Sequence, residues 1–352
     1  MGVAATLPVT KSTPATATAP GGEAAPDALS ALVELLQADL EATNRAIVAR
    51  MDSPVALIPQ LAAHIVAAGG KRLRPLLTLA SARLCGYEAP EARHVKLAAC
   101  VEFIHTATLL HDDVVDESLL RRGLASANAV FGNKASVLVG DFLFARAFQL
   151  MVEDGSLRVL DILCRASATI AEGEVLQLVI QNDLDAGEAK YLEVIRGKTA
   201  ALFQAACHVG AVVAARPEAE ERGLAEYGLN LGIAFQLVDD ALDYAADQET
   251  LGKTVGDDFR EGKITLPVLR AWAAGDAAER VFWQRTVGEL EQTDADLPEA
   301  MRLMERHGAI AATLARAREF AAEAKRALLV FPASPMRARL MDVADYTVSR
   351  AS

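Results

Sequence analysis

Apolar residues recur along most of this chain with the period of an α-helix. The segments LSALVELLQADLEATNRAIVARM (29–51) and AAEAKRALLVF (321–331) place them three or four positions apart, so each would present one apolar face. Glycine and proline lie mostly at the joints between such segments, and no run alternates apolar and polar residues as a strand would. The pattern predicts an all-α protein, a single large helical bundle of roughly ten or more helices.

The first residues follow a different pattern. Residues 1–28 are rich in Ala, Thr and Pro and contain neither a long apolar run nor an arginine. They therefore lack the features of a secretory signal and of a transit peptide. We expect a disordered tail over 1–28, one folded domain over 29–352, and a cytoplasmic location.

Two long uncharged stretches, 53–70 and 199–215, could be read as membrane spans. The first is interrupted by Pro, Gln and His, and the second contains Gln and His and is short for a span. We expect both to be buried in the protein core, and no transmembrane segment.

The sequence TATLLHDDVVDESLLRRG (106–123) interrupts the amphipathic pattern with acids. At about 100° per residue, Asp112 and Asp116 lie roughly 40° apart on one face of a helix, with Asp113 beside them. A second stretch, FQLVDDALDYAAD (235–247), repeats the Asp-Asp-x-x-Asp spacing. There Gln236 and the three acids lie within an arc of roughly 100°; the acids are Asp239, Asp240 and Asp243.

Acids that repel each other on apolar helices require something positive between them. All-oxygen carboxylate ligands suit Mg²⁺, which keeps several waters and completes its shell with phosphate oxygens. The spacing lacks the glycine turn of an EF-hand calcium loop. One such motif could be a solvated helix face, but two copies, each followed by basic residues, predict a metal site.

Composition and charge narrow the candidate partners. Hydrophobic residues make up 52% of the chain, enough for a large core, and the net charge of −12 disfavours a nucleic-acid partner. The four cysteines show no metal spacing, so we expect them to be reduced. An anionic substrate would need cations, and basic residues occur near the acids: Lys71 and Arg74 in GGKRLRP, Arg121 and Arg122, Lys198 at the expected start of a helix in GKTAALF, and Lys253 and Lys263.

These segments together resemble the trans-isoprenyl diphosphate synthases, the polyprenyl synthetase family, over about residues 35–350. The resemblance rests on GGKRLRP, EFIHTATLLHDDVVDESLLRRG, GKTAALF, FQLVDDALDY and GKTVGDDFREGKITLP. It implies a helical bundle of the isoprenoid synthase type around a deep central cavity, with 29–352 as the catalytic domain. It also implies a homodimer that adds isopentenyl diphosphate, head to tail, to an allylic diphosphate such as farnesyl diphosphate.

The resemblance assigns roles by position in these motifs. Catalytic roles fall on Asp112, Asp113, Asp116, Lys198, Asp239, Asp240, Asp243 and Lys253, and two or three Mg²⁺ ions would be held by Asp112, Asp116, Asp239 and Asp243. Contacts to the allylic diphosphate fall on Arg121, Lys198, Thr199, Gln236 and Lys253, and contacts to isopentenyl diphosphate on Lys71, Arg74, His105 and Arg122. Asp257 and Lys263 match the family's downstream motif. The resemblance implies that they support the residues that bind substrate and do not contact the substrate themselves.

Product length is the finer part of the interpretation. Short-chain members carry bulky aromatics four and five residues before the first Asp, whereas Thr108 and Ala107 occupy those positions here. The resemblance then implies a long product of about C40 to C50, of the class used for quinone side chains, ubiquinone or menaquinone. A shorter-chain farnesyl or geranylgeranyl diphosphate synthase, a terpene cyclase and a non-catalytic partner subunit are the alternatives.

Overall fold

The computed structural model describes residues 28–67, 71–121, 123–245 and 255–350. The first half contains α1 (Ala28–Leu35), α2 (Gln37–Arg50), α3 (Leu57–Ala67), α4 (Leu73–Leu84), α5 (Arg93–Val115), β1 (Leu120–Arg121), β2 (Leu124–Ala125), α6 (Ala127–Phe131), α7 (Asn133–Asp154) and α8 (Leu157–Val179). The second half contains α9 (Gly187–Ile195), the π-helical turn η1 (Arg196–Ala200), α10 (Ala201–Val213), α11 (Glu218–Ala245), α13 (Asp257–Arg260), α14 (Leu266–Ala274), α15 (Ala277–Trp283), the π-helical turn η2 (Gln284–Gly288), α16 (Asp296–Arg306), α17 (Ala309–Ala327), the 3₁₀ turn η3 (Leu328–Val330) and α18 (Pro335–Ser349).

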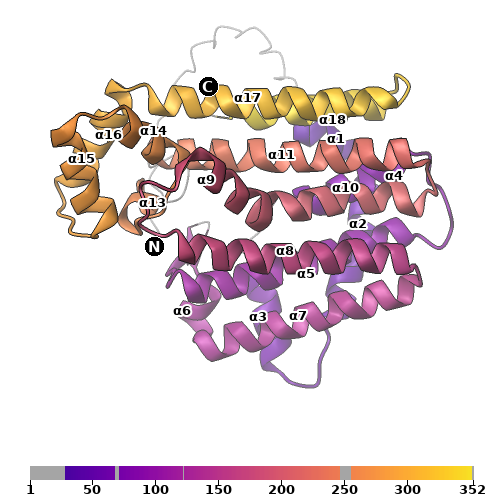
Figure 1. The fold of residues 1–352 in the computed structure, drawn as a ribbon. Helices are drawn as coiled ribbons and strands as arrows, with labels where there is room; N and C mark the ends of the chain where they lie inside the picture. Colours follow the sequence, from indigo (N-terminus) through magenta and orange to yellow (C-terminus); the bar gives the residue numbers. More distant parts are fainter. Residues whose placement is uncertain (1–27, 68–70, 122, 246–254, 351–352) are drawn as a thin grey trace, which may run out of the picture.

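Long helices form the body of the molecule. Figure 1 shows α17, α11, α10, α8 and α7 crossing the view side by side, with α4 and α5 behind them. The short helices α13 to α16 form a separate group at one end, beside α9. The all-α expectation is confirmed, and the only strands among the described residues are the two-residue strands β1 and β2, which pair antiparallel.

Local signals in the sequence fix several helix ends. Ser156 caps α8 by accepting a hydrogen bond from the Val159 backbone N–H, and Gly155, with a φ of 74°, ends α7. Asp276 and Glu279 form a capping box at the start of α15. These caps explain why α8 begins after Ser156, α15 begins after Asp276 and α7 ends before Gly155.

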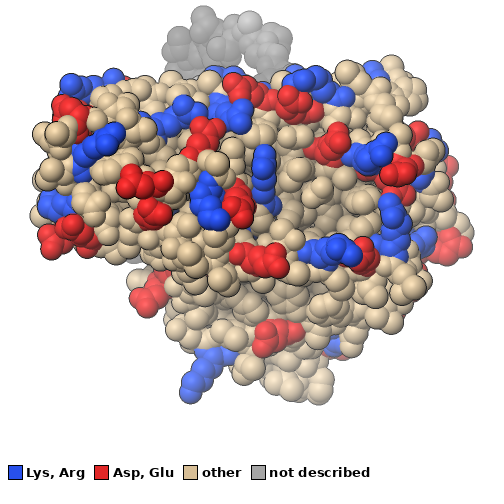
Figure 2. All heavy atoms as spheres, in the orientation of Figure 1, with Lys and Arg blue, Asp and Glu red and all other residues tan. Residues whose placement is uncertain are grey.

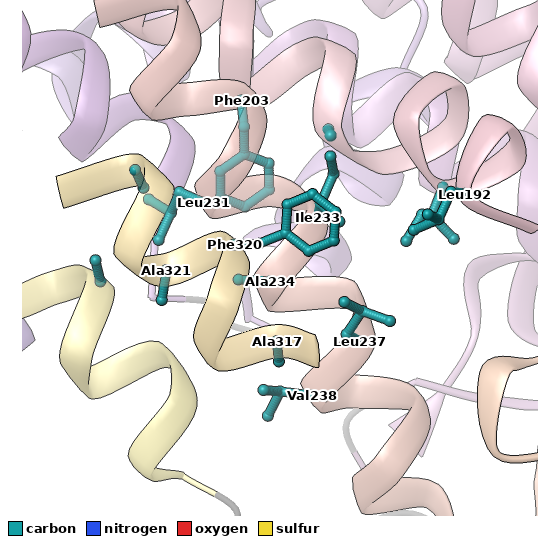
Figure 3. Close-up of a cluster of buried hydrophobic side chains, with 14 of the residues drawn as sticks. Leu192, Phe203, Leu231, Ile233, Ala234, Leu237, Val238, Ala317, Phe320 and Ala321 are labelled. Atoms are coloured by element: carbon teal, nitrogen blue, oxygen red, sulfur yellow. The ribbon is translucent and has the colours of Figure 1, made fainter. Parts of the chain in front are cut away.

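Two apolar clusters form the core. The larger one surrounds α11, where Figure 3 shows Phe203 of α10 and Phe320 of α17 packed against Leu231 and Leu237. The second lies between α5, α7, α8 and α10 and includes Phe103, which is fully buried. Each of these helices is therefore held on its apolar face, which leaves the interrupting acids at the ends of α5 and α11.

The two uncharged stretches behave differently. The stretch 199–215 contains α10, most of whose side chains are buried, as expected. The expectation for 53–70 is wrong: among the described side chains of 53–65 only Leu61 is buried, because α3 packs mainly against α6 and α7 at the edge of the bundle. Among the described helices, α7 is the one with the length and apolar composition of a membrane span, and buried core helices share that composition.

Candidate active site

The first acidic motif lies at the carboxyl end of α5. The helix ends at Val115 and Asp116 is its C-cap, but the Asp116 N–H still donates to the Asp112 carbonyl at 2.7 Å. Asp112 and Asp116 thus lie one helical turn apart, as the spacing predicts. Asp113 is buried and accepts hydrogen bonds from the Arg121 guanidinium, one of them from Nε at 2.7 Å.

A short hairpin brings Arg121 back to Asp113. Asn128 Nδ2 donates to the carbonyls of Asp113 and Ser118, at 2.9 and 3.0 Å, and Ser126 Oγ donates to the Ser118 carbonyl at 2.7 Å. These bonds tie β1 and β2 to the end of α5. Arg121, expected to contact the allylic diphosphate, is therefore already paired with the middle acid of the motif.

The environment of Asp112 favours its protonated form. Burial raises the pKa of Asp112 to about 7, against the lowering effect of Lys198 and Arg121, while Glu174 and Asp116 add to the rise. Burial without a full counter-charge has this effect on a carboxyl group. A cation bound beside Asp112 would lower its pKa again.

The second acidic motif lies on α11. Asp240 is buried and accepts hydrogen bonds from Tyr191 Oη at 2.5 Å and from Gln236 Nε2 at 2.7 Å. Thr199 Oγ1 donates to Gln236 Oε1 at 2.8 Å, so a continuous chain of hydrogen bonds joins η1 to α11. Burial raises the pKa of Asp240 to about 8, together with the charges of Asp258 and Asp239, while the two donors lower it.

The outer acids of the second motif remain partly exposed. Arg350 of the last turn of the chain donates to Asp239 Oδ1 at 3.2 Å and lies over the Phe235 ring at 4.6 Å. The Asp258 N–H donates to Asp243 Oδ2 at 3.1 Å. Both outer acids therefore interact with groups that a bound ion could replace or join.

Lys263 connects the two halves of the site. Its Nζ lies 3.4 Å from Asp116 of the first motif and 3.9 Å from Asp258, and it also pairs with Glu261. Asp257, singled out with Lys263 in the sequence, pairs instead with Arg260 near the surface. The acid beside the second motif is therefore Asp258.

The residues expected to bind isopentenyl diphosphate form a separate group. Arg74 Nη1 lies 3.1 Å from His105 Nε2, and its guanidinium lies over the Phe203 ring at 4.4 Å. Because arginine can only donate, Nε2 of His105 accepts this bond. Lys71 Nζ donates to Tyr346 Oη at 2.8 Å. Arg122 and Lys253 lie outside the described residues.

The segment GKTAALF differs from the prediction. Lys198 and Thr199 do not begin a helix but lie in the π-helical turn η1, which joins α9 to α10. The turn packs against α8 at Gly173 and Gly197, whose backbones touch, since a Cβ on Gly197 would lie 3.0 Å from the Gly173 Cα. This close packing favours the wider π turn over a regular helix start.

The two residues expected to set product length differ in exposure. Ala107 is fully buried, whereas Thr108 is partly exposed and its Oγ1 donates to the His105 carbonyl at 2.8 Å. Thr108 therefore offers the more direct access to the space beside α5.

The acids of the two motifs could bind a metal ion only if water or substrate supplied further ligands. Among the described residues, no three acidic, histidine or cysteine side chains are grouped closely enough to hold one. The partial sets have only carboxylate oxygens as donors, which fits a hard ion that keeps waters and takes oxygens from a diphosphate. The residues present thus fit Mg²⁺ when substrate is bound.

Comparison with known proteins identifies the architecture. Residues 55–304 match the model of the polyprenyl synthetase family. The chain is 49% identical over 322 residues to octaprenyl diphosphate synthase of Escherichia coli (strain K12), which covers 92% of this chain and 99% of that protein. This chain belongs to the polyprenyl synthetase family. It is a prenyltransferase with the all-α isoprenoid synthase fold.

Solved structures of the family agree in fold. A polyprenyl synthase from Caulobacter crescentus CB15, complexed with calcium and isoprenyl diphosphate, has a TM-score of 0.89 and 56% identity and covers 92% of this chain and 98% of its own. A decaprenyl diphosphate synthase from Rhodobacter capsulatus has a TM-score of 0.88 and 54% identity, with coverage of 92% and 99%.

Several residues of this prenyltransferase site were missed in the sequence. Tyr191, Glu174 and Asp258 were assigned no role, and Tyr346 and Arg350 lie beyond residue 304, where the family match ends. Each meets its partner only through folding. The one available signal was the glycine of EGE (172–174), which marks a close helix contact.

Proposed function

We propose that this prenyltransferase is a long-chain all-trans polyprenyl diphosphate synthase. It would add isopentenyl diphosphate repeatedly, head to tail, to an allylic diphosphate such as farnesyl diphosphate, until the product has about C40 to C50. The observation that carries the proposal is the presence of two separate cationic groups. Lys198 and Arg121 lie beside the first acidic motif, whereas Arg74 pairs with His105.

Each group would serve one substrate. Mg²⁺, two or three ions, would neutralise the charge of the allylic diphosphate when bound. It would be held by Asp112, Asp116, Asp239 and Asp243. Around the same diphosphate we place Arg121, Lys198, Thr199, Gln236 and Lys253, and around isopentenyl diphosphate Lys71, Arg74, His105 and Arg122.

The chain's own residues would do three things during the reaction. Lys198 and Arg121 would stabilise the negative charge that develops on pyrophosphate as the allylic C–O bond breaks. Arg74 and His105 would hold isopentenyl diphosphate so that its double bond attacks the allylic carbon. The proton then lost would go to the departing pyrophosphate, so no side-chain base is assigned.

Product length is proposed from the similarity and from the face of α5. The relatives named above include an octaprenyl and a decaprenyl diphosphate synthase. The small residues Ala107 and Thr108 leave α5 without an aromatic ring four and five residues before Asp112. The growing tail would run past Thr108 into the deep cavity expected for the family, and a cytoplasmic enzyme of this kind would supply a quinone side chain.

A homodimer is proposed from an apolar surface on α7 and α8. Leu138 and Val152 of α7 are 67% and 68% exposed, and Val175 and Val179 of α8 are 60% and 72% exposed. Figure 2 shows fewer charged side chains over α7 than over α17. An apolar surface of this kind marks an interaction site, and a second copy of this chain would cover it.

The dimer can be broken at this surface. Leu138→Glu should shift the purified protein towards monomer in sedimentation, because a buried unpaired charge is costly. Val281→Glu, at a 70% exposed position on α15, is the matched control and should leave the mass unchanged. A Leu138→Glu protein that sediments like the wild type would move the interface elsewhere.

One assay tests the proposed activity. The purified chain is incubated with Mg²⁺, farnesyl diphosphate and isopentenyl diphosphate, and the product is sized by mass spectrometry, with and without a chelator. A polyprenyl diphosphate of about C40 to C50 that disappears with chelator supports the proposal. A C15 or C20 product would make this a short-chain synthase, and a cyclic hydrocarbon would make it a terpene cyclase. A fragment of residues 29–352 should give the same product if 1–28 is only a tail.

A further inference from the structure

Lys198 reaches its partner on a neighbouring helix. Its Nζ donates a hydrogen bond to Glu174 Oε2 of α8 at 2.6 Å, and the two side chains are 22% and 25% exposed. The same ammonium lies within electrostatic reach of Asp112 and Asp116. Lys198 is thus placed between the first acidic motif and Glu174.

The backbones beside this pair are in direct contact. Gly173 precedes Glu174 and Gly197 precedes Lys198, and a Cβ on Gly173 would lie 2.5 Å from the Lys198 backbone nitrogen. Only glycine permits helices to approach this closely. The contact fixes the relative position of α8 and η1, and therefore sets the distance across which Glu174 and Lys198 meet.

The other oxygen of Glu174 has no hydrogen-bond partner in the described part of the chain. Glu174 Oε1 is a buried atom without one among the described residues, so Lys198 supplies the carboxylate's hydrogen bond. A carboxylate that is only partly exposed and accepts from a single donor contributes little to folding, because its desolvation offsets the ion pair. A carboxylate retained beside the first motif suggests a role in the site.

Without Glu174, the flexible lysine would turn to the remaining acids. A lysine carries a point charge on a four-carbon stem with several rotatable bonds. The acids within its electrostatic reach are then Asp112 and Asp116, the residues assigned to the metal. An ammonium paired with Asp112 would compete with the metal ion for that carboxylate.

We infer that Glu174 is a positioning residue, which holds the Lys198 ammonium on the α8 side of the site and so keeps Asp112 available for a divalent cation. The inference rests on the proposed function, because it assumes that Asp112 binds metal and Lys198 binds the allylic diphosphate. Glu174 would then influence metal binding although it lies outside both acidic motifs.

The test uses Glu174→Gln, which keeps the size of the side chain and removes its charge. Partners placed behind metal ligands typically contribute about 10- to 100-fold to metal affinity or activity. We expect the Mg²⁺ concentration for half-maximal activity and the KM for farnesyl diphosphate to rise by about tenfold or more. The KM for isopentenyl diphosphate should stay within about twofold, since Arg74 and His105 are untouched. Glu172→Gln, at an exposed position on the same helix, is the control and should change neither value.

A second set of variants, made in the Lys198→Ala protein, distinguishes a positioning role of Glu174 from a role in folding. In Lys198→Ala protein no ammonium can move onto Asp112, so adding Glu174→Gln should change the Mg²⁺ requirement by less than about twofold. Should Glu174→Gln fail to fold, Glu174→Asp keeps the charge with a shorter reach and should give a smaller rise in the Mg²⁺ requirement.

The outcomes are distinct. Product formation by wild type and Glu172→Gln tests the proposed function independently of Glu174. An unchanged Mg²⁺ requirement in Glu174→Gln, an equal effect in both Lys198 backgrounds, or an equal rise in both substrate KM values would overturn the positioning role.

Discussion

In α5 the middle carboxylate of the acidic motif, Asp113, accepts hydrogen bonds from the guanidinium of Arg121, whereas in α11 the corresponding Asp240 accepts from the neutral groups of Tyr191 and Gln236. Both carboxylates are buried. The first is paired with a full counter-charge, whereas no cation among the described residues forms an ion pair with the second, and burial raises the pKa of Asp240 to about 8. Equal spacing in the sequence therefore does not mean equal chemistry.

The middle and outer acids of each motif have different roles. In each, the middle acid is held by the protein and the outer acids face groups that can be exchanged. Arg121 and Gln236 each hold a middle acid and are also expected at the allylic diphosphate. Binding of the allylic diphosphate would therefore affect both motifs. It would act on Asp113 through the charge of Arg121 and on Asp240 through the neutral hydrogen bond of Gln236.

The largest effect is expected at the outer acids, where the motifs should behave alike. Asp112→Ala and Asp239→Ala should each lower kcat by about a thousandfold or more, because metal-assisted charge stabilisation contributes several kcal/mol. Steady-state kinetics at saturating Mg²⁺ measures this. Asp161→Ala, at an exposed acid of α8, is the control. Near-normal turnover in either variant would remove that acid from the metal site.

The middle acids should respond unequally when their partners are removed. Arg121→Ala leaves Asp113 buried without its cation, which should cost about 3 kcal/mol or more in the free energy of unfolding. Tyr191→Phe removes one neutral donor from Asp240 and should cost about 1–2 kcal/mol. Denaturant titration measures both.

A matched control isolates the site effect of the tyrosine. Tyr227→Phe loses a comparable buried hydrogen bond, to the Leu340 carbonyl at 2.8 Å, outside both motifs. It should lower stability by about 1 kcal/mol and leave kcat unchanged, whereas Tyr191→Phe should lower kcat as well. Equal losses of stability in Arg121→Ala and Tyr191→Phe would contradict the unequal roles proposed for charge.

The residues just before the two acidic motifs also differ in size. Four and five residues before Asp112 lie Thr108 and Ala107, while the corresponding positions before Asp239 are Phe235 and Ala234. Thr108→Phe should shorten the product towards C15 or C20, because a ring at this partly exposed position would stand in the path of the tail. Mass spectrometry of the product measures the change.

Ala107→Phe is a harder variant to interpret. Ala107 is fully buried, so the added ring should also cost about 1–3 kcal/mol of stability by overpacking. If both aromatic variants fold and still make the wild-type product, the tail does not pass this face of α5, and the argument for a long product from residues 107–108 fails.

A further difference between the two middle acids concerns pH. The pKa of Asp240 is about 8 when folded, against an ordinary value of 3.8. Between these values the unfolded chain has lost the proton that the folded protein keeps, so this group lowers stability as pH rises from about 4 to about 8. The variant Asp240→Asn cannot titrate at this position and should lack this slope. In thermal melts of the metal-free proteins, the Tm of the variant relative to the wild type should therefore rise steadily from about pH 5 to pH 8. A constant difference in Tm would contradict the raised pKa.

Much of the fold followed from local patterns. Helical periodicity predicted the bundle, and the spacing of Asp112 and Asp116 placed them one turn apart, as the structure has them. The hairpin of Leu120–Ala125 was missed because two-residue strands leave no alternating pattern. The π turn at Lys198 was missed because it depends on contact between Gly173 and Gly197, which local propensity does not encode.

The partners of the site were less predictable than its acids. Tyr191 meets Asp240 across 49 residues of sequence, and Arg350 meets Asp239 across 111. Nothing in the spacing around either acid points to these distant residues. Their roles became visible only when α9 and α18 were placed against α11.

The most direct test is a crystal structure with Mn²⁺ and an unreactive thio analogue of farnesyl diphosphate, read by anomalous scattering. The account predicts ions at about the 2.0–2.2 Å distance typical of such oxygen ligands, bound by Asp112 and Asp116 on one side and Asp239 and Asp243 on the other. Asp113 should remain on Arg121, and Asp240 on Tyr191 and Gln236. An ion coordinated by Asp113 or Asp240, or no ion at either motif, would contradict the division between outer and middle acids.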